Sequence, residues 1–162
     1  MTNKVKLTDE GRAMIQFQLK PFEGMTLERV RFKLDTGADL TTISKKELNV
    51  LGYSPEWIKE NTVKEEKRTL SSAGGRSVTA YYVPILISNL FGRDFKKWPF
   101  YIRIEDDRDY PNLLGIDVLA HFNFSISYDS GFLEIEPADN PVIRLPMLEG
   151  QEVGELSSAR GV

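Results

Sequence analysis

The segment Asp35-Thr36-Gly37-Ala38 places a carboxylate directly after an apolar strand pattern, so a rigid element can present it. Thr36 supplies a hydroxyl close to the backbone, and Gly37 permits the close approach of another chain segment. Amides around such a turn can donate hydrogen bonds to the carboxylate and tune its acidity. Asp35 is therefore a candidate for acid–base chemistry, although Asp-Thr-Gly also occurs in ordinary turns.

The rest of the composition narrows the available chemistry. The chain contains no cysteine, which excludes disulfides, thiolate catalysis and Cys-based zinc sites. Its single histidine, His121, follows an expected helical turn, and we interpret it as structural. A metal site of His and carboxylates would lack a second imidazole, so we expect no metal and no cofactor. Hydrolytic chemistry would have to use carboxylates, Lys or Tyr.

The elements that must position Asp35 are short strands. Apolar side chains alternate with polar ones over 15–19 and 30–34, which predicts a hairpin whose second strand ends at Asp35. Ser44 with Glu47 is typical of a capping box and predicts a helix over 45–51, and Pro55 favours a further helical turn over 54–58. Further strands are expected over 41–44, 63–70, 77–87, 95–104, 124–128 and 132–136.

Length and composition indicate one globular domain. The chain has 162 residues, of which 41% are hydrophobic, and its net charge is -3 with both signs interspersed. This charge gives no reason to expect nucleic acid or an anionic membrane as a partner. No transmembrane segment or signal peptide is evident, which predicts a cytoplasmic location. We expect an N-terminal extension over 1–12, the domain over 13–136 and a C-terminal tail over 137–162.

Three features in order resemble the retropepsins, the retroviral-type aspartic peptidases. The first is the run 32–39 around Asp35-Thr36-Gly37-Ala38. The second is the glycine-containing segment 71–76, at the place of the family's flap. The third is Leu113-Leu114-Gly115, which is followed by a helical turn. The resemblance spans residues 14–136 and implies an all-β, single-domain, closed β-barrel with a flap hairpin and one or two short helices.

The resemblance also implies roles for particular residues. Asp35 would be the catalytic acid and base, Thr36 would hydrogen-bond across a dimer axis, and Gly37 would let two loops meet. Gly115 would allow the Leu114 strand to pass under the catalytic loop. Ala38 would support the active site, and substrate would contact Asp39, Ala73, Gly74 and Gly75.

This chemistry needs two carboxylates that share a proton. Asp129-Ser130-Gly131 is the intrachain candidate for the second one, as in two-lobed enzymes. Only 31 residues follow Gly131, too few for a second flap and a second Leu-Leu-Gly element, and a tight hairpin turn explains the segment. We therefore expect the second Asp35 to come from the symmetric partner of a homodimer.

Other acidic and aromatic residues have alternative interpretations. Asp39 is a candidate for a substrate subsite or for an ion pair with Lys or Arg. Asp117 is expected at the N-terminus of the helical turn, with an arginine as a candidate partner. The acidic patch 105–109 lacks a calcium-loop pattern and is interpreted as a solvated loop. Trp57, Tyr81 and Tyr82 are candidates for substrate contacts near the flap or for the core.

The sequence therefore predicts an aspartic endopeptidase that binds extended polypeptides as a homodimer. The alternative is a non-catalytic dimerisation or peptide-binding module with the same fold. A precursor that is active only on itself is a third possibility.

Overall fold

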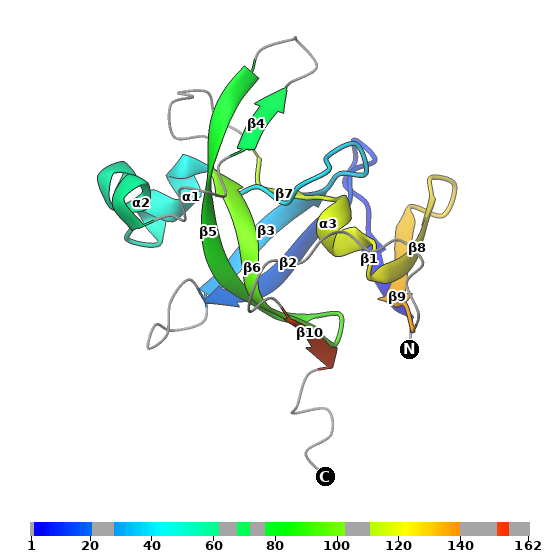
Figure 1. Ribbon diagram of the computed structural model, residues 1–162. Coiled ribbons are helices and arrows are strands. Elements are labelled where there is room, and N and C mark those ends of the chain that lie inside the picture. The colour runs from blue at the N-terminus through cyan, green and yellow to red at the C-terminus, as the bar shows by residue number, and fades with distance from the viewer. Residues whose placement is uncertain are drawn as a thin grey trace.

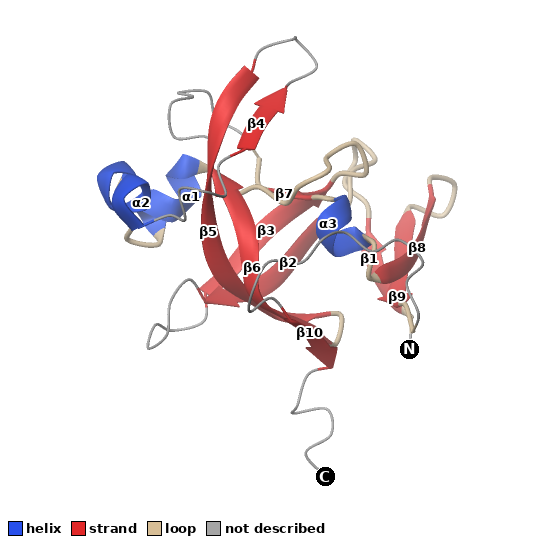
Figure 2. Cartoon of the chain, viewed as in Figure 1, coloured by secondary structure: helices blue, strands red, loops and turns tan. Residues whose placement is uncertain are grey.

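The computed structural model describes residues 2–20, 28–61, 68–71, 77–102, 111–139 and 152–155. Strands dominate and the helices are short, as the sequence predicts (Figure 1 and Figure 2). No helix within these residues is long and apolar enough to cross a membrane. In chain order, the elements are β1 (Asn3–Lys6), β2 (Met14–Lys20), β3 (Glu28–Leu34), α1 (Lys45–Val50), α2 (Pro55–Asn61), β4 (Arg68–Ser71), β5 (Ser77–Leu90), β6 (Arg93–Ile102), β7 (Leu113–Leu114), α3 (Ile116–Leu119), β8 (Phe122–Ser127), β9 (Phe132–Pro137) and β10 (Glu152–Glu155).

The hairpin of β2 and β3 confirms the strands predicted before Asp35. Its antiparallel register runs from the pair Met14–Lys33 to the pair Leu19–Glu28. Because successive side chains point to opposite faces, the apolar positions of both strands enter the core. The buried members are Ile15, Phe17, Leu19, Val30, Phe32 and Leu34.

The larger sheet has the order β10-β6-β5-β2-β3-β7, and β4 pairs with β5. Antiparallel pairing connects β5 and β6, which the chain joins through a tight turn. By contrast, β3 and β7 are parallel, with Leu34 opposite Leu114. This parallel pairing brings two segments that are far apart in the sequence to the same sheet edge.

Aromatic side chains fill the interior next to this sheet. Phe17 stacks on Phe32 with ring centroids 4.7 Å apart, and Phe32 meets the edge of Phe100 at 5.7 Å. Phe95 and Trp98 contact each other edge to face at 4.9 Å. All of these aromatic residues belong to one connected core of buried side chains.

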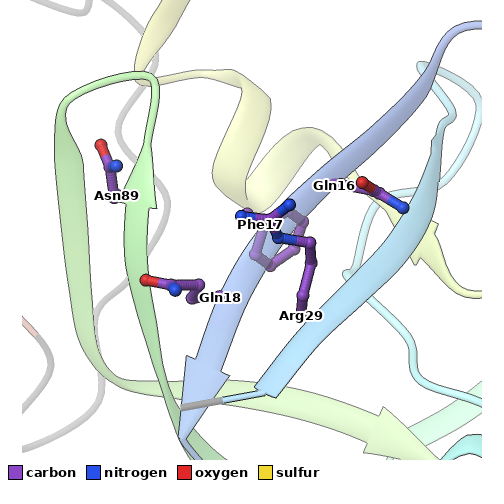
Figure 3. Close-up of a pocket in the computed structure, with 5 residues that line it drawn as sticks. All are labelled: Gln16, Phe17, Gln18, Arg29 and Asn89. Carbon is purple, nitrogen blue, oxygen red and sulfur yellow. The ribbon is translucent and has the colours of Figure 1, made fainter.

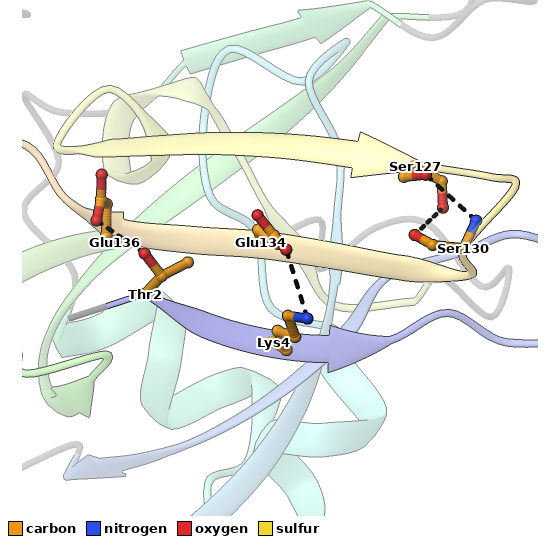
Figure 4. Close-up of polar contacts among 6 residues, drawn as sticks. All are labelled: Thr2, Lys4, Ser127, Ser130, Glu134 and Glu136. Carbon is orange, nitrogen blue, oxygen red and sulfur yellow. Dashed lines mark hydrogen bonds and ion pairs between the residues drawn. The ribbon is translucent and has the colours of Figure 1, made fainter.

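A second, three-stranded sheet has the order β1-β9-β8. Within the predicted N-terminal extension, β1 pairs with β9 from Asn3–Ile135 to Lys6–Phe132. Figure 4 shows the polar contacts on this sheet, where Lys4 lies 3.7 Å from the Glu134 carboxylate. The predicted closing hairpin of β8 and β9 is confirmed.

Several predicted boundaries differ from the structure. Residues 41–44 form only isolated bridges at Thr42, because Thr42 sits between Tyr101 and Leu113 at a crossing point. Helix α2 runs to Asn61, beyond the predicted 54–58 turn. The predicted tail contains β10, which pairs with β6. Closure into a barrel stays a prediction.

Candidate active site

Asp35 follows the last residue of β3 and is held from both sides. Its backbone N–H donates to the Leu114 carbonyl at 3.0 Å, which continues the parallel pairing with β7. On the other side, the Leu34 N–H donates to the Ala13 carbonyl at 2.9 Å. The half-buried Asp35 is thus presented at the end of a central strand with two paired neighbours.

The turn after β3 folds back onto the Asp35 carboxylate. The Gly37 N–H donates to Asp35 Oδ1 at 2.9 Å, and the Ala38 N–H donates to the Asp35 carbonyl at 3.2 Å. Among the described residues, Asp35 Oδ2 has no hydrogen-bond partner. Thr36 and Gly37 are exposed. The arrangement leaves one carboxyl oxygen available at an open face of the loop.

Gly115 lies where the loop that follows Asp35 crosses the segment after β7. A Cβ at this position would lie 2.6 Å from the Leu40 carbonyl carbon and oxygen and 2.9 Å from the Ala38 oxygen. The Ile116 N–H donates to the Ala38 carbonyl at 2.8 Å directly beside this crossing. Only a glycine allows two backbones to pass so closely.

Asp117 is buried and accepts hydrogen bonds from three donors. The Thr41 hydroxyl lies 2.7 Å from Asp117 Oδ1, the Val118 N–H donates to the same oxygen at 2.9 Å, and Trp98 Nε1 lies 3.2 Å from Oδ2. Burial raises the pKa of Asp117, and the hydrogen bonds from Thr41, Trp98 and Val118 oppose that rise. Within the described residues, Asp117 has no arginine partner, because Trp98 of β6, Val118 of α3 and Thr41 already surround this carboxylate.

Asn112, which precedes Leu113-Leu114-Gly115, connects the segment at Ser44 to β3. Its side-chain oxygen accepts from the Ser44 N–H at 2.8 Å, and its side-chain nitrogen donates to the Arg31 carbonyl at 3.0 Å. Next to it, Thr42 and Leu113 exchange two backbone hydrogen bonds of 2.9 Å. A buried amide that satisfies two separate chain segments fixes their spacing.

Sequence reasoning missed Thr41 and Asn112 as supports of the Asp35 loop, and it missed Trp98 as a hydrogen-bond partner of Asp117. Asn112 directly precedes Leu113-Leu114-Gly115 and Thr41 lies shortly after the run 32–39, so their position near the two motifs was the available signal. Trp98 lies in a strand pattern, and nothing local indicates that its indole N–H reaches Asp117. The structure brings these three residues together with the segments around Asp35 and Gly115.

Other residues singled out in the sequence lie away from this loop or outside the described residues. Asp129 lies in the turn between β8 and β9, and Gly131 there has φ of 77°. His121 contacts the Phe95 and Trp98 rings edge to face, consistent with a structural role. The following predictions fall outside the residues or side chains that the structure describes: Ala73, Gly74, Gly75, the patch 105–109 and the side chains of Tyr81 and Tyr82.

Asp39 and Trp57 have definite positions. Asp39 is exposed and makes no ion pair within the described part of the chain, while its carbonyl accepts from the Asp117 N–H at 3.2 Å. Trp57 lies in α2 and packs against Tyr53, which precedes this helix, with ring centroids 5.4 Å apart. Within the described residues, no group of three or more His, Asp or Glu side chains could hold a metal ion.

A separate depression of about 330 Å³ lies on the strands β2, β3 and β5 (Figure 3). Asp35 does not line this depression. The polar side chains that line the depression face outward from the sheet. They comprise Gln16, Gln18, Arg29 and Asn89. Its lining contains no carboxylate, so it offers no group for the chemistry expected of Asp35.

No family model matches the sequence, and no curated protein matches it closely enough to count as a relative. Among solved structures, the chain is similar to a retropepsin-like aspartic protease from Rickettsia conorii, with a TM-score of 0.55 and 17% sequence identity. The similarity covers 83% of this chain and 90% of that chain. At this identity, the likeness shows that the two share a fold.

Proposed function

Given a retropepsin-like fold with a carboxylate at the end of β3, we propose that this protein is an aspartic endopeptidase completed by a second copy of the chain. The single observation that carries the proposal is the geometry of Asp35. Its Oδ1 accepts the Gly37 N–H at 2.9 Å, and the loop that holds it crosses Gly115 at backbone contact distance. The hydrogen bond from Gly37 alone is that of a common Asx turn, and its place at the end of β3 beside the Gly115 crossing, in a retropepsin-like fold, supports a catalytic role for Asp35.

The reaction requires two Asp35 carboxyl groups with one proton between them. Two carboxylates a few ångströms apart cannot both ionise easily, so they share a proton and titrate as a unit. The ionised group takes a proton from water as the water oxygen bonds to the scissile carbonyl carbon. The protonated group donates to the carbonyl oxygen, which gives a tetrahedral intermediate. When the C–N bond breaks, the first carboxyl group gives the proton that it took from water to the amine nitrogen, and the second takes a proton back from a hydroxyl of the intermediate, so the pair again holds one proton.

The second carboxylate comes from a symmetric partner in this proposal. Asp129 lies in a hairpin turn that has its own explanation, since the Ser130 N–H donates to the Ser127 side chain at 3.2 Å. A C2 dimer with the exposed Thr36 and Gly37 near its axis would place two copies of Asp35 together. The substrate class is an extended polypeptide, bound as an added strand next to the Asp35 loop.

The test compares Asp35→Asn with the wild-type protein on a diverse peptide library between about pH 4 and 7. Asp35→Asn should abolish cleavage and keep the same melting temperature and dimer. Asp129→Asn is the matched control, because it makes the same chemical change in the turn and should retain activity. Cleavage by Asp35→Asn, or no cleavage by a wild-type dimer, would refute the proposal, and the second result would favour a non-catalytic module.

A mixing experiment tests the shared site. Addition of an equal amount of Asp35→Asn protein should lower wild-type activity to about half once subunits exchange, because mixed dimers hold only one functional carboxylate. Activity per chain should also fall on dilution below the dimer dissociation constant. Activity that is unaffected by the variant, with exchange verified, would show that one chain is sufficient.

A further inference from the structure

Asp117 is a buried carboxylate that contacts the candidate catalytic loop through a side chain. Its relative exposure is 5%, and it lies in the first turn of α3. Burial of a charge is costly unless donors surround it. Two of its donors, Val118 and Trp98, belong to the helix itself and to β6, whereas Thr41 belongs to the segment that follows Asp35.

Thr41 connects this carboxylate to Gly115. The fully buried Thr41 hydroxyl donates to Asp117 Oδ1 at 2.7 Å and accepts from the Gly115 N–H at 3.0 Å. A hydroxyl has one proton, and an ionised carboxylate can only accept. Asp117 therefore orients the Thr41 proton toward itself and leaves an oxygen lone pair for the Gly115 amide. The direction of the chain of hydrogen bonds is fixed.

The hydrogen bonds that connect Thr41 to Asp117 and Gly115 lie at the far end of the loop that begins at Asp35. At the near end, the Asp35 N–H donates to the Leu114 carbonyl at 3.0 Å. At the far end, the Thr41 side chain holds the next residue, Gly115, at the place where a Cβ would not fit. Two backbone hydrogen bonds also join the loop to this segment: Ile116 N–H to Ala38 O and Asp117 N–H to Asp39 O.

We propose that Asp117 is a positioning residue, which holds Thr41 and through it sets the distance between the Asp35 loop and the Gly115 segment. The inference rests on the proposed peptidase function. It assigns a role to a carboxylate that touches neither substrate nor Asp35. A displacement of the loop by a fraction of an ångström would misplace each Asp35 relative to its symmetric copy, so the effect would appear in the chemical step.

Trp98 offers a matched comparison because it binds the same carboxylate on the other side. Trp98 Nε1 donates to Asp117 Oδ2 from β6 at 3.2 Å, whereas Thr41 uses Oδ1. Trp98→Phe and Thr41→Val each remove one hydrogen bond from Asp117. Only Thr41→Val also removes the acceptor of the Gly115 N–H.

The experiment measures kcat, KM, melting temperature and dimer content of these two variants and of Thr41→Ser. Thr41→Val should lower kcat roughly tenfold to a hundredfold with KM little changed. Thr41→Ser should restore most of kcat because it keeps the hydroxyl. Trp98→Phe should lower the melting temperature with kcat close to that of the wild type. An unchanged kcat in folded, dimeric Thr41→Val, or an equal loss in Trp98→Phe, would overturn the inference.

A double variant tests whether Asp117 acts through Thr41. Asp117→Asn alone should lower kcat, since an amide cannot accept at both of its positions. In the Thr41→Val background, Asp117→Asn should lower kcat no further, because the link is already lost. Additive losses would overturn the inference.

The same measurements separate this inference from the proposed function. Wild-type protein that cleaves peptides, Asp35→Asn that does not, and Thr41→Val with normal kcat would refute only the role of Asp117. A wild-type dimer with no activity would refute the peptidase function and the inference with it.

Discussion

Substitution of Gly115 by alanine tests the crossing of the two backbones that holds Asp35. The added Cβ would lie 2.6 Å from the Leu40 carbonyl carbon and oxygen, about 0.8 Å short of the 3.4 Å at which ordinary contact begins. The obstacle is backbone, so no rotamer change can relieve it. Overpacking of this kind costs about 1–3 kcal/mol in the free energy of unfolding. The corresponding decrease in melting temperature is roughly 2–4 °C per kcal/mol for a chain of this size.

The displacement of Leu40 and Ala38 by the added Cβ should have a larger effect on kcat than on the free energy of unfolding. If Leu40 and Ala38 move by a large part of an ångström, the loop moves with them, and a shift of about 1 Å can cost on the order of a hundredfold in rate. We therefore expect Gly115→Ala to remain folded at 25 °C and to lose roughly tenfold to a hundredfold in kcat on a peptide substrate.

Gly92→Ala is the matched control. Gly92 has φ of 85° and no atom within 4 Å of an added Cβ, so alanine there costs backbone strain without a steric conflict. That strain is about 1–2 kcal/mol, similar to the expected cost at Gly115. Thermal melts and steady-state kinetics of both variants separate the two effects. Normal kcat in Gly115→Ala, or an equal loss of kcat in Gly92→Ala, would refute the reasoning.

Three further predictions concern stability. Ser44→Ala should lower the free energy of unfolding by about 1 kcal/mol, because the Ser44 hydroxyl oxygen caps α1 by accepting from the Glu47 N–H. Ser44→Asp should retain the cap, and thermal melts of both variants measure the difference. Asn112→Asp should destabilise by about 1–3 kcal/mol in urea unfolding, because it keeps the acceptor for Ser44 and loses the donor to the Arg31 carbonyl. Burial raises the pKa of Tyr53 to about 12 from its usual 10.0, so the unfolded chain ionises first and stability should be lost as pH rises through that interval. The loss is at most about 1.4 kcal/mol per pH unit, and it should be absent in Tyr53→Phe when unfolding is compared across the same pH range. Equal slopes for the two proteins would contradict the burial of Tyr53.

The sequence alone allowed the prediction of the local elements. The alternation over β2 and β3 follows directly from one buried face, and the cap of α1 follows from Ser44 and Glu47 three residues apart. The hairpin of β8 and β9 was equally visible because Asp129-Ser130-Gly131 supplies turn residues between two alternating runs. The sequence did not predict β1 and β10, because their short polar patterns gain meaning only from the strands with which they pair.

The sequence by itself determined which chemistry is possible, because the absence of cysteine and the single histidine leave carboxylates as the strongest candidates. It also determined that Asp35 follows a strand and that a glycine stands at position 115. Only the tertiary structure decided what surrounds them. The parallel pairing of β3 and β7 brings Asp117 to Thr41 and Trp98, and hydrogen bonds between distant segments leave no periodicity in the chain. Asp35-Thr36-Gly37-Ala38 identifies a carboxylate, and the fold determines how firmly it is held.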